Sequence, residues 1–75
     1  MDKALLKYYV EKNGETMKML AEVLGIHPNT LSRKVNGVDE FTQGEINIIV
    51  ARYNLSPDET MKIFFNDVKV ANLET

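Results

Sequence analysis

Apolar residues recur along most of this chain at intervals of three and four, which is the spacing of one face of an α-helix. The clearest stripe consists of Ile46, Ile49, Val50 and Tyr53. Turn and capping residues divide the pattern into separate segments. The sequence therefore predicts five helices, over about residues 2–12, 16–24, 28–36, 42–53 and 56–65.

Short polar signals mark the ends of these helices. Asn13 and Gly14 end the first helix, because both tolerate the left-handed backbone conformation. Pro28 suits the first position of the third helix, where its missing N–H would be unpaired in any case. The fourth and fifth helices each open with a capping box, in which a hydroxyl and a glutamate three residues later satisfy free backbone donors. The two boxes are Thr42 with Glu45 and Ser56 with Glu59.

Each helix has a predicted inward face. We expect these faces to carry Leu5, Leu6, Tyr9, Leu20, Ala21, Leu24, Ile26, Leu31, Val35, Ile46, Ile49, Val50, Tyr53, Met61, Phe64 and Phe65. The spacing also places Tyr8 and Phe41 in the core, and not in a platform that stacks nucleic-acid bases.

Residues 16–37 contain two of the predicted helices with a single glycine between them. Where two helices cross closely beside a tight turn, the first needs a small residue and the turn needs a residue that tolerates positive φ. Ala21 and Gly25 stand at these two positions. The segment therefore predicts a helix-turn-helix, which points to DNA binding.

The length of 75 residues suits one domain with a single modest core. We predict that residues 1–66 form this domain and that residues 67–75 form a C-terminal tail. Val68 and Val70 flank Lys69 with the period of a strand. The tail is predicted to be irregular or, alternatively, to be a strand or helical extension used in self-association.

Composition argues against several other classes of protein. The chain has no cysteine and one histidine, so we expect no disulfide, no metal site and no other cofactor. It lacks a glycine-rich phosphate loop and an evident pair of catalytic carboxylates, so we expect no enzyme. No stretch approaches the ~18 apolar residues of a membrane span, and no signal-peptide core is present. We therefore expect a cytoplasmic protein without a membrane partner.

The net charge of −2 argues against DNA binding, because much of the affinity for DNA comes from cations that neutralise phosphates. The charges are unevenly distributed, however. Residues 1–15 are neutral overall, residues 16–37 carry +2 and residues 38–75 carry −4. The one basic segment therefore coincides with the predicted helix-turn-helix.

Leu31 and Val35 face inward, so the opposite side of the third helix is predicted to face DNA. Arg33 can bind guanine O6 and N7 with two hydrogen bonds, asparagine can pair with adenine, and a hydroxyl can serve a base or a phosphate. The predicted base-facing set is Asn29, Arg33 and Asn36, with Pro28, Thr30 and Ser32 beside them.

Lys18 and Lys34 are predicted to reach DNA phosphates, together with the free backbone amides that begin the second helix at its cap, Thr16. His27 is predicted to cap the third helix or to contact a phosphate. Simpler interpretations stay open. Arg33 and Lys34 could belong to a solvated helix face, and His27 could be an exposed turn residue.

Residues 16–37 resemble the pattern Thr-Gln-x-x-Leu-Ala-x-x-x-Gly-x-(Ser/Thr)-x-x-x-(Leu/Ile)-Ser-x-x-x-Asn-Gly of the Cro/repressor helix-turn-helix family, also called the XRE family. The likeness extends from Leu5 to Phe65, and its later part is similar to small phage-encoded regulators of Gram-positive hosts. The resemblance implies an all-α, compact, five-helix, lambda-repressor-like domain with its helix-turn-helix at the second and third helices. It further implies a transcriptional regulator of a bacterial or phage-infected cell that inserts the third helix into the major groove of double-stranded DNA.

Several positions depart from the family pattern. Met17 replaces a glutamine that the family often uses on a phosphate, and His27 replaces a Ser or Thr cap. Pro28 stands where many relatives have a polar base-reading side chain, while Asp39 and Glu40 occupy a loop that is often basic. We therefore expect modest affinity, steep salt sensitivity and binding as a homodimer to two half-sites about one helical turn apart.

The same departures favour an alternative function. A helix-turn-helix with an acidic surface could bind a protein partner as an antirepressor or accessory subunit, with its DNA binding weak or lost. Met17, Pro28, Asp39 and Glu40 favour this protein-binding module. The residues Lys18, Asn29, Arg33 and Asn36 favour DNA, which is the function that the sequence supports better.

Overall fold

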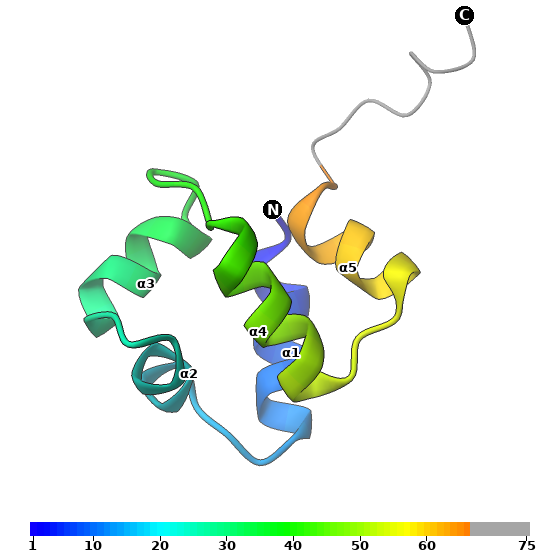
Figure 1. Ribbon diagram of the computed structural model, residues 1–75, viewed down its shortest axis with the longest axis horizontal. Helices are drawn as coiled ribbons and strands as arrows, with labels where there is room; N and C mark the ends of the chain where they lie inside the picture. The colour runs from blue at the N-terminus through cyan, green and yellow to red at the C-terminus, as the bar shows by residue number, and fades with distance from the viewer. Residues whose placement is uncertain (67–75) are drawn as a thin grey trace, which may run out of the picture.

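The computed structural model describes residues 1–66, which form five helices and no strand (Figure 1). The helices are α1 (Lys3–Lys12), α2 (Met17–Leu24), α3 (Pro28–Val35), α4 (Gln43–Tyr53) and α5 (Pro57–Phe64). The predicted all-α class and the five helices are confirmed, with ends close to those expected. The predicted tail, residues 67–75, lies outside the described residues.

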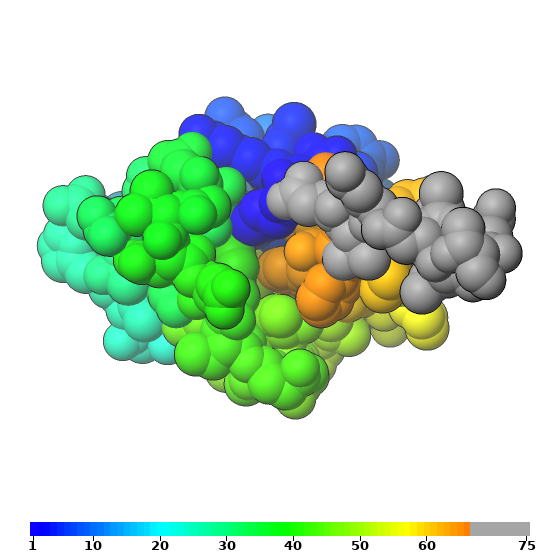
Figure 2. Space-filling model, turned by 90° about the horizontal axis from the view of Figure 1, so that it is seen from above, coloured from blue at the N-terminus to red at the C-terminus, as the bar shows by residue number. Residues whose placement is uncertain are grey.

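The five helices pack around a central pair, α1 and α4 (Figure 1). α2 and α3 lie at one end of the molecule and α5 at the other, with α1 and α4 between them (Figure 1). From above, the N-terminus lies between the α3–α4 loop and α5 (Figure 2). Met1, Asp39 and Phe64 are among the residues that line a hollow of about 390 Å³ there. Among the helices of residues 1–66, none has the length and apolar character needed to cross a membrane.

Side chains cap the start of every helix in the described residues. The capping residues are Asp2, Thr16, His27, Thr42 and Ser56, each of which accepts a backbone N–H. Both predicted capping boxes are confirmed, since Glu45 accepts the Thr42 N–H at 2.9 Å and Glu59 accepts the Ser56 N–H at 2.7 Å. A cap of this kind contributes about 1 kcal/mol, so the helix starts follow from local sequence.

One core joins all five helices. Its buried residues are Leu6, Val10, Leu20, Ala21, Leu31, Val35, Ile49, Tyr53, Leu55 and Ile63. Partly buried residues packed against them are Met1, Leu5, Tyr9, Met17, Leu24, Ile26, Phe41, Val50 and Phe64. Most of the predicted inward positions are therefore confirmed, and Val10, Leu55 and Ile63 join them.

Three predicted core residues are exposed instead, and those predictions are wrong. They are Tyr8, Met61 and Phe65, which are 54%, 48% and 39% exposed. In α5 the fully buried residue is Ile63, whose carbonyl accepts the Asp2 N–H at 2.7 Å. The Tyr9 hydroxyl donates to Glu59 at 2.8 Å. These contacts turn the face of α5 that carries Glu59 and Ile63 toward α1, which leaves Met61 outside.

The junction of α2 and α3 has the two features predicted for a helix-turn-helix. Ala21 is completely buried, and Gly25 has a φ of +71° in the left-handed region. The Ile26 N–H donates to the Ala21 carbonyl at 3.0 Å and closes the turn. A glycine reaches this backbone conformation without a Cβ clash, and so α3 can fold back onto α2.

Candidate nucleic-acid interface

The outer face of α3 is the one that the sequence predicted. Leu31 and Val35 are only 2% and 6% exposed, so the other sides of this helix lie at the surface. The exposed residues of the predicted set are Pro28, Asn29, Ser32, Arg33 and Asn36, while Thr30 is half-buried. Five polar or small side chains thus share the surface of one short helix and its C-cap.

Two of the predicted interface residues act as helix caps. The Thr16 hydroxyl oxygen accepts the Met19 N–H at 3.2 Å, and His27 Nδ1 accepts the Asn29 N–H at 3.1 Å. The structure thus shows the capping role of His27. Because Nδ1 is the acceptor, the proton of the neutral ring lies on Nε2, which stays available as a donor at the exposed start of α3.

Three lysines gather at a shallow groove between α1, α2 and α3, which we call the lysine groove. It has a volume of about 300 Å³. It is lined by Lys3, Lys7, Met17, Lys18, Pro28, Leu31, Ser32 and Val35. The amines of Lys7 and Lys18 make no hydrogen bond or ion pair within residues 1–66, so their charge stays available to a ligand. Positive charge from two helices therefore lies beside the outer face of α3.

Sequence reasoning missed Lys3 and Lys7. The net charge of residues 1–15 is zero, which suggested no basic surface there. Two of the three acids of that segment are used elsewhere, since Asp2 caps α1 and Glu15 forms an ion pair with Arg52 of α4. The signal that could have found the two lysines is their i, i+4 spacing, which puts them on one face of α1.

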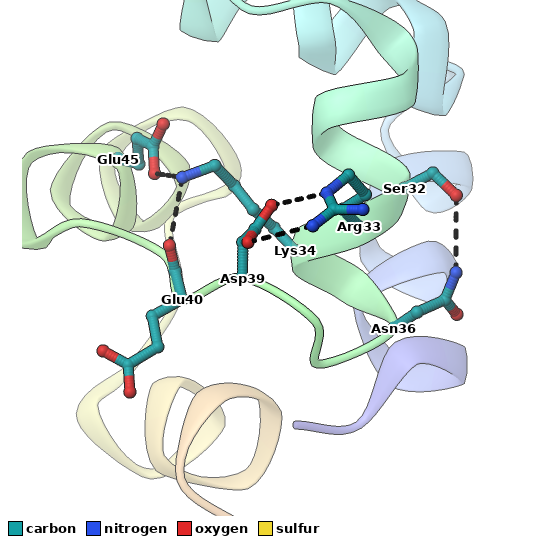
Figure 3. Close-up of polar contacts among 7 residues, drawn as sticks. All are labelled: Ser32, Arg33, Lys34, Asn36, Asp39, Glu40 and Glu45. Carbon is teal, nitrogen blue, oxygen red and sulfur yellow. Dashed lines mark hydrogen bonds and ion pairs between the residues drawn. The ribbon is translucent and has the colours of Figure 1, made fainter.

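Asn36 joins this surface to α1. The Lys3 amine donates to Asn36 Oδ1 at 3.0 Å. Figure 3 shows the second contact of this amide, in which Asn36 Nδ2 donates to the Ser32 hydroxyl at 3.3 Å. All three residues are exposed. The amide of Asn36 is therefore held in one orientation beside the C-terminal end of α3.

Arg33 is paired with a carboxylate of the α3–α4 loop. Its Nε donates to Asp39 Oδ2 at 2.8 Å and its Nη2 donates to Oδ1 at 3.4 Å (Figure 3). The two side chains keep 58% and 43% of their surfaces exposed. The hydrogen bond between them raises the pKa of Arg33 and lowers the pKa of Asp39, so both groups are charged at neutral pH.

Lys34 points toward α4. Its amine donates to Glu45 Oε1 at 2.8 Å and to the Glu40 carbonyl at 3.0 Å (Figure 3), and it lies 5.9 Å from the centre of the Phe41 ring. The Lys34 side chain is only 11% exposed. A phosphate contact by Lys34, as the sequence predicted, would require these interactions to be given up. Arg33 and Lys34 are therefore two neighbouring cations, and each is already paired with an acidic residue of the same domain.

Comparison with known protein families shows which family the chain belongs to. The model of the family described as Helix-turn-helix matches residues 6–60, from α1 into α5. The chain belongs to the XRE-type, Cro/C1-like helix-turn-helix family. The comparisons with curated proteins and with solved structures find no match.

Membership of this helix-turn-helix family identifies the chain as a DNA-binding regulator in general terms. The predicted resemblance is confirmed at the level of the family. In such a motif α3 is the second helix. Its exposed polar residues, together with its C-cap, form what we call the polar stripe: Asn29, Ser32, Arg33 and Asn36. Within residues 1–66, no group of three or more His, Cys, Asp or Glu side chains is arranged to hold a metal ion.

Proposed function

We propose that this chain is a sequence-specific transcriptional regulator of the Cro/repressor type that places α3 in the major groove of double-stranded DNA. The observation that carries the proposal is the joint position of the polar stripe of α3 and the lysine groove. A helix in the major groove has a phosphate strand on each side, so a reading helix needs cations beside it. Lys7 and Lys18 meet that need next to Pro28 and Ser32.

The proposed base contacts come from α3. In helix-turn-helix proteins the N-terminal residues of the second helix reach base edges most readily. Asn29 stands at that end, exposed and with its side-chain amide available for adenine. Arg33, one turn later, suits guanine, while Ser32 and Thr30 lie beside them for a base or a phosphate.

The proposed phosphate contacts come from the lysine groove and from the helix caps. Lys3, Lys7 and Lys18 supply charge, and Thr16 lies with the free amides at the start of α2, whose partial positive charge favours an anion. His27 Nε2 adds a donor at the start of α3. Lys34 is not part of this proposed set, because its amine is held by Glu45.

We further propose that the regulator acts as a homodimer in the cytoplasm of a bacterial or phage-infected cell. A single domain presents one α3 of eight residues, which can read only one half-site. Two linked copies on half-sites about 34 Å apart would bind with higher affinity than either copy alone. The C-terminal tail is the segment that we propose for self-association.

Selection from random duplexes at low salt tests the proposal. The expected result is an enriched palindromic sequence, together with a mass in solution or on DNA that corresponds to two chains. Selection that enriches no sequence would overturn sequence-specific binding. An enriched site without dyad symmetry, bound by one chain, would overturn the dimer alone.

One observation favours the alternative function, a protein-binding module with weak DNA binding. Arg33 and Lys34 are two of the three positively charged residues in 16–37, and both are paired with acids of the same domain. This pairing leaves little free positive charge on α3 itself. If the alternative holds, selection enriches no sequence, and affinity purification from the source cell yields a specific protein instead.

A further inference from the structure

The pairing of Arg33 with Asp39 occupies only one edge of the guanidinium. A guanidinium has five N–H donors in a flat fork. Asp39 takes the side edge, formed by Nε and one hydrogen of Nη2. The end edge, with Nη1 and the second hydrogen of Nη2, is left over, and its two parallel donors match guanine O6 and N7.

The backbone holds Asp39 in place for this contact. The Val38 N–H donates to the Arg33 carbonyl at 2.9 Å, and the Asp39 N–H donates to the same carbonyl at 3.3 Å. Asp39 is therefore tied to Arg33 by its main chain as well as by its carboxylate. A long, exposed arginine side chain has many rotamers, and a fixed carboxylate on one edge reduces them.

We propose that Asp39 is a positioning residue that holds the end edge of Arg33 outward, so that discrimination at one guanine of the operator depends on Asp39. The inference rests on the proposed function, since it needs α3 in the major groove. It assigns a role to an acid that counted, from the sequence, as evidence against DNA binding. Asp39 lowers general attraction to phosphates by neutralising Arg33, and in exchange it sharpens the reading of one base.

The opposite interpretation is that Asp39 only neutralises Arg33. The two differ in a measurable ratio, the affinity for the selected operator divided by the affinity for the same duplex with that guanine pair replaced. Positioning makes the ratio depend on Asp39. Neutralisation changes both affinities equally and leaves the ratio unchanged.

The experiment compares the full chain with the variants Asp39→Asn, Glu40→Gln, Arg33→Ala and the double variant of Arg33 and Asp39. Glu40→Gln is the matched control, because it removes the same charge one residue away. The Glu40 carboxylate makes no hydrogen bond or ion pair within residues 1–66, and its side chain is exposed. Each protein is measured on the operator, on the duplex with the replaced guanine pair, and on an unrelated duplex.

Asp39→Asn is expected to lower the ratio about tenfold and to raise affinity for the unrelated duplex. Glu40→Gln is expected to raise all three affinities and to keep the ratio. Arg33→Ala should remove the discrimination at that guanine, and adding Asp39→Asn should then change the ratio no further. In the free protein, the Arg33 Nε–H should exchange with water faster in Asp39→Asn than in the parent.

Two results would overturn the inference and leave the proposed function intact. One is an operator ratio that Asp39→Asn leaves at the parent value. The other is a change that Asp39→Asn also produces in the absence of the Arg33 side chain. A parent that discriminates no sequence would instead overturn the proposed function, and this inference with it.

Discussion

The amine of Lys34 and the carboxylate of Glu45 form an ion pair at 2.8 Å that ties α3 to the start of α4. Both side chains are nearly buried, at 11% and 13% exposed. Burial acts to raise the pKa of Glu45, but hydrogen bonds from Lys34 and from the Thr42 backbone outweigh it, so the pKa is lowered. Glu45 therefore completes the capping box of α4 and is the counter-ion of Lys34 at the same time.

Replacement of Lys34 by Met should destabilise the domain without weakening its hold on DNA phosphates. The substitution keeps an unbranched side chain as far as the ε-carbon but leaves Glu45 a nearly buried carboxylate without its cation, which costs about 1–3 kcal/mol. Urea unfolding measures this loss. The slope of log affinity against log salt should stay at the parent value, because the amine is internal.

Lys18→Met is the matched control for Lys34→Met. Lys18 is exposed and makes no hydrogen bond or ion pair within the described range, residues 1–66. Its replacement should leave stability almost unchanged and reduce the salt slope by about one. The reverse pattern, with Lys34 controlling the salt slope and Lys18 controlling stability, would contradict the division of roles.

The lysine groove makes a prediction for α1, a helix outside the helix-turn-helix. Lys7→Ala should weaken binding to every duplex alike and lower the salt slope by about one, because its amine is placed for a phosphate. Lys12→Ala is the control on the same helix, since the Lys12 amine lies 5.8 Å and 5.9 Å from the rings of Tyr8 and Tyr9, away from the groove. Equal salt slopes for the two variants would contradict the assignment of the lysine groove to the DNA interface.

Gly25 and Gly44 should respond to alanine in opposite directions. A Cβ at Gly25 would meet nothing within 4 Å, so the cost of Gly25→Ala is that of the left-handed backbone alone, about 1–2 kcal/mol. Gly44 lies in the first turn of α4, where a Cβ would come 3.9 Å from the Thr42 hydroxyl, an ordinary contact. Gly44→Ala should stabilise the domain by about 0.5 kcal/mol, because alanine favours the helix. Thermal unfolding of the two variants beside the parent measures both effects, and loss of stability in both would contradict the prediction.

The sequence predicted helix ends better than helix faces, for a physical reason. Caps and turns depend on residues within four positions of one another, as Thr42 and Glu45 do, so local rules find them. The inward face of α5 is different. An inward face made of Met61 and Phe64 is as apolar as one made of Ile63 and Phe64. The contact of Ile63 with Asp2, which is distant in sequence but adjacent in the fold, sets the outcome.

The candidate site divides in the same way. The outer face of α3 was predictable, because Leu31 and Val35 fix which side of the helix is buried. The partners of Arg33 and Lys34 lie six and eleven residues further on, across a loop whose path no local rule gives. Lys7 comes to α3 only through the packing of α1. Charge counts along the chain therefore misjudged which cations are available.

Tyr53 makes the domain sensitive to alkaline pH. Its side chain is 6% exposed, and burial, followed by the neighbouring Glu15 carboxylate, raises the pKa of Tyr53 from about 10 to about 12. The folded state thus keeps a proton that the unfolded state releases, so the stability from this group is complete below pH 10 and is lost as the pH rises toward 12. Between pH 8 and pH 11 the loss should be about 1 kcal/mol. Tyr53→Phe keeps the ring and removes the titrating group, and other alkaline titrations cancel in the comparison with the parent. Urea unfolding at the two pH values should therefore show a steeper loss for the parent, and parallel losses would mean that the Tyr53 hydroxyl ionises as easily in the folded state as in the unfolded one.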